Sequence, residues 1–541
     1  MSDYAIGVDF GTESGRVLLL DLGTGKEVAV SVVRYPSTVI DRTLPSTGEQ
    51  LPHDWALQDP SDWVTVLEKG IPETISQAGV SKDDVCGLGI DVTSCTVLPV
   101  SSEGVALCTL EQWRDRRHAW PKLWKHHAAQ AVADRLTDVA LEREEEFLSR
   151  YGGRISSEWY YPKVIELWLE DREIYDAAHG FIEATDWIVW YLTGVECRQT
   201  CTAGYKAMWS PTDGLPSSEF FEAAYPGFAQ PEEKLGTSFA PLGTCAGNLL
   251  ADVAERLGLA ESVAVAVGNV DSFVSVPGAG VEHPGAFVMV VGTSICDMVV
   301  DQREIRLPGI TGVLKDGILP GLYGYEAGQV AVGDMLAWFI ETIAPERSYE
   351  QLERAAGEIE PGATGLVALD WWNGNRTTLA DADLTGVICG LTLQSTVEQI
   401  YRALLESIAF GNRRIMENFE EHGLELSEIV ACGGIAERSP LMMQLLADSS
   451  GLEVQVPAST EVPARGAALF GAVAAGVFED IASAVAAMRP GIARTYRPEP
   501  AAKQTYDQVY AIYRRLYETL GRTQNELLHE LKRIRTERQG G

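Results

Sequence analysis

The sequence predicts an α/β protein built from two related domains. A chain of 541 residues is too long for one ordinary hydrophobic core. Residues 4–21 and 285–300 have similar sequence patterns and lie about half a chain apart. Each pattern predicts an apolar strand, a short glycine-containing turn and a second apolar strand. A pattern that returns at such spacing indicates two similar units that face one another.

The first segment is a predicted buried β-hairpin, because residues 5–8 and 17–20 are apolar and rich in β-forming side chains. Its turn is unusually polar and contains Asp9, Gly11, Thr12, Ser14, Gly15 and Arg16. A carboxylate, glycines that allow close backbone approach, hydroxyls and a cation suit a phosphate chain that carries Mg²⁺. Taken alone, the stretch is better explained as an ordinary glycine-rich hairpin turn.

The second hairpin has Gly292, Thr293 and Ser294 in its turn, so the phosphate tail of ATP could be clasped between the two turns. With this pair of turns the chain resembles the FGGY family of carbohydrate kinases, whose fold is shared with actin, hexokinase and the Hsp70 ATPase domain. The resemblance implies a two-domain actin-like ATPase (ribonuclease H-like) fold, with a mixed sheet flanked by helices in each domain.

The resemblance also implies roles for the turn residues, with ATP and Mg²⁺ as cofactors. Asp9 is the expected Mg²⁺ residue. The implied nucleotide and phosphate contacts are Gly11, Thr12, Glu13, Ser14, Arg16, Gly292, Thr293, Ser294, Gly433 and Gly434.

Composition excludes several classes of partner. A formal net charge of −34 argues against nucleic acid and anionic membranes, which are bound through clustered Lys and Arg. No apolar run is long enough to span a bilayer and no signal segment is present, so we expect a cytoplasmic protein. Nine cysteines without paired CxxC spacing predict reduced, mostly buried thiols. An acidic protein that binds ATP must depend on Mg²⁺, backbone N–H groups and a few local cations.

After the first hairpin we expect a surface excursion over residues 34–55, then a helix over 59–78 with Asp59 as its N-cap and Pro60 as its first residue. A strand over 85–91 leads into a run of small hydroxylated residues that includes Thr96. Such a run can border a sugar site through hydroxyl hydrogen bonds, or it is simply a turn.

The segment 110–117 contains Trp113, Asp115 and Arg117, and this Trp-x-Asp-x-Arg spacing resembles a family segment beside the substrate pocket. Asp115 is therefore a candidate acceptor for sugar hydroxyls. The alternative is a surface ion pair with its neighbouring arginines, which is the commoner fate of such a cluster.

Residues 151–163 and 202–209 closely resemble segments of the family members that phosphorylate ketopentoses. Lys206 stands in the second of them among small and aromatic residues. A lysine in such a run either donates to sugar hydroxyls or reaches solvent past the aromatic rings. The resemblance favours the sugar role.

The strand over 264–270 ends at Asp271. This carboxylate is either a helix N-cap or a general base, because phosphoryl transfer to an alcohol needs a carboxylate that orients the hydroxyl and accepts its proton. The Gly268-x-x-Asp271 context resembles that of the family's catalytic base, so Asp271 is the expected catalytic residue and also a substrate contact.

Glu326 lies among glycines and tyrosines in 321–329, so it is either a ligand of sugar hydroxyls, as the resemblance implies, or a cap for the helix expected near 332. A long amphipathic helix over 396–416 follows. The turn at Gly433 and Gly434 leaves room for adenine or phosphate and matches the family's adenosine motif.

We therefore expect an N-terminal domain over 1–265, a C-terminal domain over 266–485 and a helical extension over 486–541. The implied activity is ATP-dependent phosphorylation of a ketopentose, L-ribulose to L-ribulose 5-phosphate, in L-arabinose catabolism. Two alternatives stay open: another kinase of the family, for xylulose, D-ribulose or a polyol, or a non-catalytic sugar-responsive binding protein. The expected partners are a sugar and ATP, and the sequence leaves a monomer and a homodimer both open.

Overall fold

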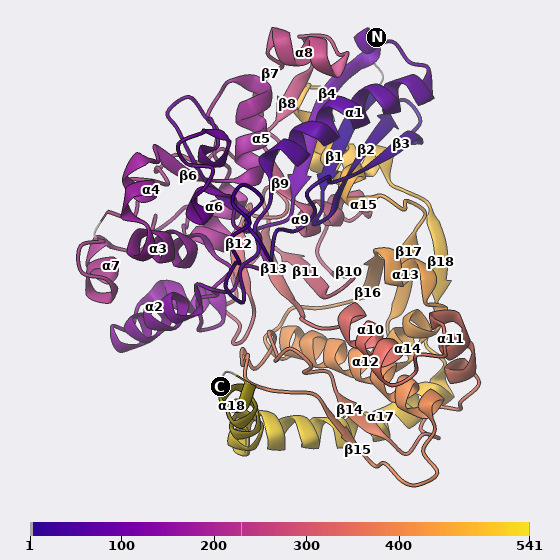
Figure 1. Cartoon of the computed structure of the whole chain (residues 1–541). Helices are drawn as coiled ribbons and strands as arrows, with labels where there is room; N and C mark the ends of the chain where they lie inside the picture. Colours follow the sequence, from indigo (N-terminus) through magenta and orange to yellow (C-terminus); the bar gives the residue numbers. More distant parts are fainter. Residues whose placement is uncertain (1–3, 229, 540–541) are drawn as a thin grey trace.

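The computed structural model describes residues 4–228 and 230–539 and has two lobes, each built on a seven-stranded mixed sheet (Figure 1). In the first sheet the order is β3-β2-β1-β4-β8-β7, with β9 beside β4, and in the second it is β12-β13-β11-β10-β16-β17-β18. The predicted two-domain α/β architecture is confirmed.

The first sheet consists of β1 (Tyr4–Phe10), β2 (Ser14–Asp21), β3 (Glu27–Arg34), β4 (Val85–Val92), β7 (Cys245–Asn248), β8 (Ala264–Ala266) and β9 (Asn269–Val270). The second consists of β10 (Ala286–Val291), β11 (Ile295–Asp301), β12 (Gly312–Lys315), β13 (Tyr323–Gln329), β16 (Glu428–Cys432), β17 (Glu453–Pro457) and β18 (Ile492–Tyr496). Two small antiparallel pairs are formed by β5 (Val97–Val100) with β6 (Gly180–Glu183) and by β14 (Val367–Leu369) with β15 (Val387–Cys389).

The helices of the first half of the chain are α1 (Pro60–Ala78), α2 (Gln130–Glu142), α3 (Tyr160–Glu170), α4 (Arg172–Ala177), α5 (Ala184–Thr193), α6 (Thr200–Ala207), α7 (Ser218–Ala224), α8 (Ala251–Leu257) and α9 (Asp271–Gly278). Those of the second half are α10 (Gly333–Thr342), α11 (Tyr349–Gly357), α12 (Val397–Glu421), α13 (Gly434–Arg438), α14 (Pro440–Ser450), α15 (Val462–Ala474), α16 (Ile481–Met488), α17 (Pro500–Glu518) and α18 (Glu526–Gln539). Within the described ranges, none of these helices is both long and apolar enough to cross a membrane.

The start of α1 follows the sequence prediction. The Asp59 side chain accepts a hydrogen bond from the Ser61 N–H at 2.8 Å, and Pro60 is the first helical residue. A proline costs nothing there, because the N–H that it lacks would have no partner inside the helix. The helix ends at Gly79, which adopts a left-handed φ of 66°. Both the predicted cap and the predicted extent of this helix are confirmed.

The central strands of the two sheets have the same topology. In the first lobe β1 pairs antiparallel with β2 and parallel with β4, and in the second β10 pairs antiparallel with β11 and parallel with β16. The two hairpins recognised in the sequence therefore occupy equivalent places in two equivalent sheets.

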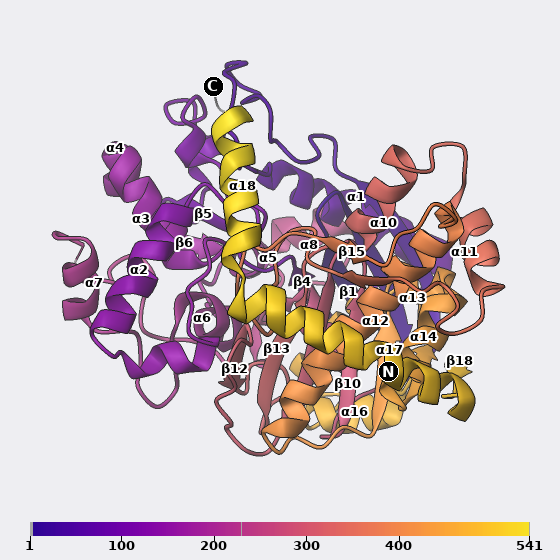
Figure 2. The same cartoon turned by 90° about the horizontal axis from the view of Figure 1, so that it is seen from below.

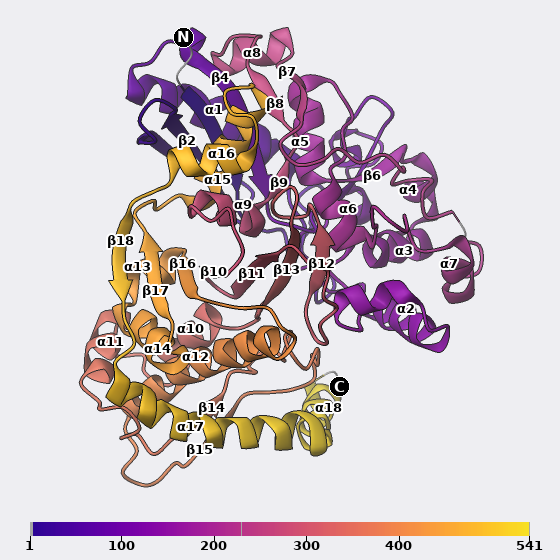
Figure 3. The same cartoon turned by 180° about the vertical axis from the view of Figure 1, so that it is seen from behind.

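Helix α15 belongs to the second half of the chain but packs against β1 and β4 of the first lobe, as Figure 3 shows. Close approach is possible because glycines face it. A Cβ at Gly7 would lie 1.7 Å from the Ala464 carbonyl oxygen, and one at Gly89 would lie 1.9 Å from that of Ala467. The expected division after residue 265 falls inside β8, and β9 also belongs to the first sheet, so the chain leaves the first lobe later and returns to it with α15.

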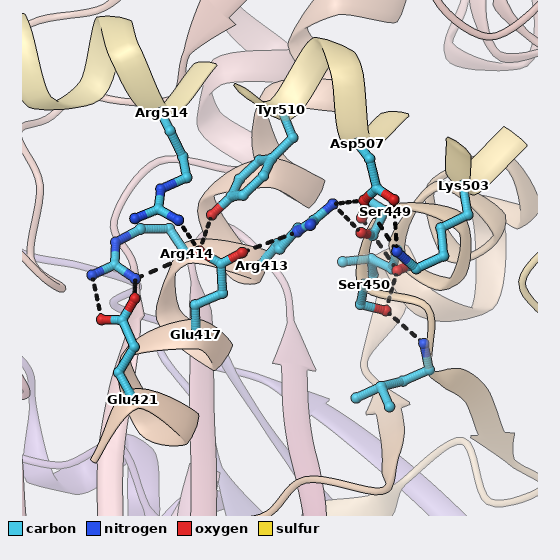
Figure 4. Close-up of polar contacts among 12 residues, drawn as sticks. Arg413, Arg414, Glu417, Glu421, Ser449, Ser450, Lys503, Asp507, Tyr510 and Arg514 are labelled. Carbon is cyan, nitrogen blue, oxygen red and sulfur yellow. Dashed lines mark hydrogen bonds and ion pairs between the residues drawn. The ribbon is translucent and has the colours of Figure 1, made fainter. Parts of the chain in front are cut away.

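The last segment of the chain is fastened to the second lobe. Strand β18 pairs antiparallel with β17, so residues 486–541 contribute a strand to the sheet as well as the expected helices. Helix α17 then lies against α12 and α14 through a polar network (Figure 4). In it Arg413 contacts Asp507 at 2.7 Å, and the Tyr510 hydroxyl donates to Glu417 at 2.7 Å. Figure 2 shows α18 turning from the end of α17 toward the first lobe.

Candidate active site

The first turn is a charged hairpin. Asp9 and Arg16 are cross-strand partners in the β1–β2 register, and Arg16 Nη1 lies 3.2 Å from Asp9 Oδ2. The same guanidinium reaches Glu461 Oε2 at 3.4 Å with its Nε. The Gly11 N–H donates to the Ser14 carbonyl at 3.1 Å and closes the turn, and Trp124 Nε1 donates to Thr12 Oγ1 at 3.0 Å. Glu13, at the tip, is exposed.

Three acidic side chains gather where the parallel strands end. The register places Asp9 of β1 opposite Asp91 of β4, and Asp91 opposite Asn269 of β9, while Asp271 begins α9 two residues later. Both carboxylate oxygens of Asp91 are buried, and within the described chain the Asp9 carboxyl is the one group placed to share a proton with them. Burial, followed by the nearby Asp9 and Asp271 charges, raises the pKa of Asp91 well above its usual range. Burial and the Asp9 charge also raise the pKa of Asp271 to about 7.

This arrangement suits a divalent cation. Mg²⁺ in phosphate-transfer sites is held by one or two carboxylates together with substrate phosphates and water. Asp9 and the buried Asp91 could supply those carboxylates, and a cation would remove the cost of burying them. A cluster of three or more ligand-type side chains, typical of a fully protein-built metal centre, is not found in residues 4–228 and 230–539.

The second turn is built from backbone groups. The Gly292 N–H donates to the Ser294 carbonyl at 2.9 Å, and the Thr293 carbonyl accepts from the Val332 N–H at 2.9 Å. The space beside Gly292 is open, since an added Cβ would meet nothing nearer than 3.8 Å. Gly433 stands beside this turn with a φ of 93°, and a Cβ on it would lie 2.7 Å from the Val291 carbonyl oxygen. The structure therefore brings the second hairpin and the Gly433-Gly434 turn together, because β16 runs parallel to β10.

A buried ion pair joins the lobes next to the acidic group. Lys206 Nζ, on α6, lies 2.8 Å from Glu326 Oε2 and 3.1 Å from Oε1, on β13, and both side chains are nearly inaccessible. Burial by itself would lower the pKa of Lys206, but the Glu326 charge outweighs it, so the pKa of Lys206 is raised. Asp271 feels the charges of Asp9, Lys206 and Glu326, so these four expected site residues lie close together.

Two other predicted sugar residues lie differently. Asp115 is exposed, and its carboxylate is 3.8 Å from Arg114 Nε, which is the surface ion pair considered as the alternative. The structure does not bring it to the group around Asp271. Thr96 is fully buried, and its hydroxyl donates to the Thr93 carbonyl at 3.1 Å, so this group is used within the turn.

Several residues of this region were not identified from the sequence. A cavity of about 540 Å³ lies between the segments 154–159 of the first lobe and 372–385 of the second, and its lining includes His127, Glu158 and Arg376. Asp91 could have been found, because it ends a strand as Asp9 does. Glu158 lies in the segment 151–163 that the resemblance singled out, but no role was assigned to it. Arg376 gave no signal, since it lies in an irregular segment whose position depends on distant contacts.

The two lobes have one central topology and a glycine turn at the same strand pair, and carboxylates gather at the strand ends of the first sheet. This arrangement is that of the actin-like ATPase fold. The N-terminal domain model of the FGGY family of carbohydrate kinases matches residues 4–278, and the C-terminal domain model matches residues 287–475. The chain therefore belongs to the FGGY family of carbohydrate kinases, enzymes that transfer a phosphoryl group from ATP to a sugar.

Curated relatives cover nearly the whole chain. A ribulokinase of Anoxybacillus flavithermus is 47% identical over 98% of this chain and 96% of its own length. A ribulokinase of Shouchella clausii is 46% identical over 100% of this chain and 99% of its own. Among solved structures, a xylulose kinase from Lactobacillus acidophilus superimposes with a TM-score of 0.80 at 18% identity, covering 97% of this chain and 99% of its own. At that identity the structural match supports the fold alone.

Proposed function

We propose that this protein transfers the γ-phosphoryl group of ATP to the terminal hydroxyl of L-ribulose and forms L-ribulose 5-phosphate. The observation that carries the proposal is the full-length similarity, at 46–47% identity, to proteins named ribulokinase. The surroundings of Asp271 support it, because the charges of Asp9, Lys206 and Glu326 all act on this carboxylate, as expected for a base that serves both a phosphate chain and a sugar.

Asp271 is the proposed general base. It accepts the proton of the attacking hydroxyl as the bond to phosphorus forms, and it orients that hydroxyl for in-line attack. Its pKa of about 7 suits this role, because a base whose pKa lies near the working pH is both available and strong enough. The free Oδ2 supports the assignment, since the only hydrogen bond of the side chain within the described residues is from the Ser272 N–H to Oδ1, at 2.7 Å.

The two turns are the proposed phosphate sites. Arg16, Thr12 and the backbone N–H groups of the first turn, with those of Gly292, Thr293 and Ser294, would stabilise charge that develops on the γ-phosphoryl oxygens. Asp9, with Asp91 beside it, would hold Mg²⁺, which supplies positive charge to the phosphate chain when bound. Gly433 and Gly434 would leave room for the adenosine.

Lys206 and Glu326 are the proposed sugar ligands, one as donor and one as acceptor for hydroxyl groups. Because their ion pair spans the lobes, sugar binding and lobe closure would favour one another. We place the reaction in the cytoplasm, where ATP is available and buried thiols such as Cys95, Cys108, Cys201 and Cys432 stay reduced.

The test is a substrate panel. The purified protein is assayed for ADP release with Mg²⁺, ATP and L-ribulose, D-ribulose, D-xylulose, ribitol or a ketohexose. L-Ribulose should give the highest kcat/KM. Preference for the polyol or the hexose would refute the ribulose assignment.

The second arm of the test is Asp271→Asn. This variant should fold with a thermal midpoint at least as high as that of the wild type and lose kcat by roughly 10²–10⁴-fold, the usual contribution of a general base. Full activity in this variant would remove Asp271 from the mechanism, and no activity of the wild type on any sugar would favour a binding protein.

A further inference from the structure

A second ion pair joins the lobes beside the Lys206–Glu326 pair. Glu158 lies just before α3 in the first lobe, and Arg376 lies in the loop between β14 and β15 in the second. Arg376 Nη2 donates to Glu158 Oε1 at 3.3 Å. Neither residue has a role in the mechanism proposed above.

The pair faces the cavity of about 540 Å³ and is not sealed from it. The Arg376 side chain is 23% exposed and that of Glu158 is 18% exposed. A guanidinium has five N–H donors, and only one Nη2–H of Arg376 has a partner within residues 4–228 and 230–539. The pair therefore offers unused donors and an unused carboxylate oxygen to whatever enters the cavity.

The charges of the Lys206–Glu326 pair act on the Glu158–Arg376 pair. Burial raises the pKa of Glu158, but the Arg376, His127 and Lys206 charges outweigh it, so the pKa is lowered overall. Burial likewise lowers the pKa of Arg376, but Glu158, and further off Glu326, raise it overall. Asp271 in turn feels Lys206 and Glu326. The Lys206–Glu326 pair therefore acts electrostatically on the proposed base and on both members of the Glu158–Arg376 pair.

Arg376 is held by an ordered loop. Asn375 and Asp381 exchange two backbone hydrogen bonds of 2.8 Å, and the Leu379 N–H donates to Asn375 Oδ1 at 2.9 Å. The Thr377 hydroxyl accepts from the Gly328 N–H at 3.2 Å, which ties the loop to the end of β13, the strand of Glu326.

The C-terminal helices brace the same loop from outside. The Thr378 hydroxyl is 2.9 Å from the Tyr517 hydroxyl of α17, and His529 Nε2 of α18 is 2.8 Å from Asp381. Lys532 of α18 donates to the Ala382 carbonyl at 2.7 Å. A guanidinium fixed in this way loses little freedom when it binds, so its hydrogen bonds can contribute strongly to affinity.

We propose that Glu158 and Arg376 form a second sugar-recognition pair, which binds the carbonyl end of the ketose, remote from the hydroxyl that is phosphorylated. Arg376 donates hydrogen bonds to the carbonyl oxygen and to an adjacent hydroxyl, and Glu158 accepts from a hydroxyl. This inference rests on the proposed function, because it assumes an acyclic ketose with its terminal hydroxyl at Asp271. It assigns the discrimination between ketoses and polyols to Arg376.

The experiment compares Arg376→Met with Arg306→Met. Arg306 is a matched control, because its Nη1 also contacts the other lobe, at Ser149 Oγ 3.0 Å away, but it does not line the cavity. Arg376→Met should raise the KM for L-ribulose by about 10–100-fold, as expected for the loss of hydrogen bonds from a charged donor, and leave the KM for ATP within twofold. The control should leave both KM values within twofold.

Two further measurements separate recognition from simple joining of the lobes. Calorimetric titration of L-ribulose and ribitol should show that Arg376→Met loses affinity for the ketose far more than for the polyol. Arg376→Lys should recover part of the ketose affinity, and Glu158→Gln should weaken both ligands. Thermal midpoints of all variants verify folding.

The outcomes are distinct. A wild type that phosphorylates L-ribulose, together with an Arg376→Met variant whose ketose affinity is unchanged or falls equally for ribitol, refutes this inference and leaves the proposed function standing. A wild type that neither binds nor phosphorylates any ketose refutes both.

Discussion

The turn between β1 and β2 and the turn between β10 and β11 stand at the same place in two sheets of equal topology. The register pairs Asp9 with Arg16 across the first hairpin, whereas it pairs Val291 with Ile295 across the second. The second turn is organised by backbone hydrogen bonds to Val332 and Gly333. One topology thus carries two kinds of proposed phosphate turn, one built on side-chain charge and the other on backbone hydrogen bonds.

The difference between the two turns indicates where charged side chains are needed. The first turn lies beside Asp91 and Asp271, buried carboxylates whose charge would be balanced by Arg16 and, in the proposed mechanism, by Mg²⁺. The acidic residue that contacts the second turn, Asp334, is exposed, and its N–H donates to the Thr293 carbonyl, so N–H groups would suffice there. The comparison predicts that side-chain changes will be severe in the first turn and mild in the second.

Among substitutions in the two turns, the largest expected effect is that of Asp9→Asn. Loss of this carboxylate should lower kcat/KM by roughly 10²–10³-fold, the scale on which single electrostatic groups act in transition-state stabilisation. Binding of Mn²⁺ with ADP, followed by electron paramagnetic resonance, should weaken in parallel. Unchanged Mn²⁺ binding would mean that the first turn does not need its charge.

The pH dependence comes next. Because Asp271 must be deprotonated to act as a base and its pKa is about 7, kcat/KM should fall about tenfold per pH unit below 7. The contribution of Asp271 to the free energy of unfolding changes with pH in the opposite direction. The folded pKa is raised from 3.8, so the stabilisation from this group is complete below pH 3.8 and is lost as the pH rises through about 7.

Asp271→Asn is the matched variant for both pH effects. The residual kcat/KM of this variant should no longer fall as the pH drops below 7. The ligand-free variant should also be more stable than the wild type at pH 8, as measured by urea unfolding. A fall in kcat/KM that persists in the variant would be assigned to another group.

Glycine substitutions test how strongly each turn depends on its backbone conformation. Gly433→Ala should destabilise the protein by about 1–3 kcal/mol, because Gly433 has a φ of 93° and its Cβ would crowd Val291. Gly11→Ala, where the nearest atoms are 3.1 and 3.2 Å away, should cost less. Urea unfolding of the two variants measures the difference, and equal costs would show that the Gly433-Gly434 turn is no more constrained than the first turn.

The smallest effect is expected for Thr293→Ala. The Thr293 side chain is on the backbone-built turn, so its loss should reduce kcat/KM by less than about tenfold. A loss as large as that of Asp9→Asn would remove the distinction between the two turns.

Much of the fold could be predicted from the sequence, because it is encoded by neighbours along the chain. The alternation of apolar residues indicated both hairpins, and Asp59 followed by Pro60 indicated the start of α1. The glycines at 433 and 434 were recognised as a turn for the same reason. Each of these features depends on local backbone geometry, which a few consecutive residues determine.

The composition of the site was decided by tertiary structure. Asp91 joins Asp9 because β1 and β4 are parallel neighbours, and Arg376 meets Glu158 because a loop braced by the last helices reaches across the lobes. The motif around Asp115 looked equally suitable in sequence but lies exposed. The amino-acid sequence by itself determined two hairpins, their polar turns and a carboxylate after a strand. Which side chains share one cavity was decided only by strand pairing and lobe packing, because those contacts join residues up to hundreds of positions apart, and no local pattern specifies them.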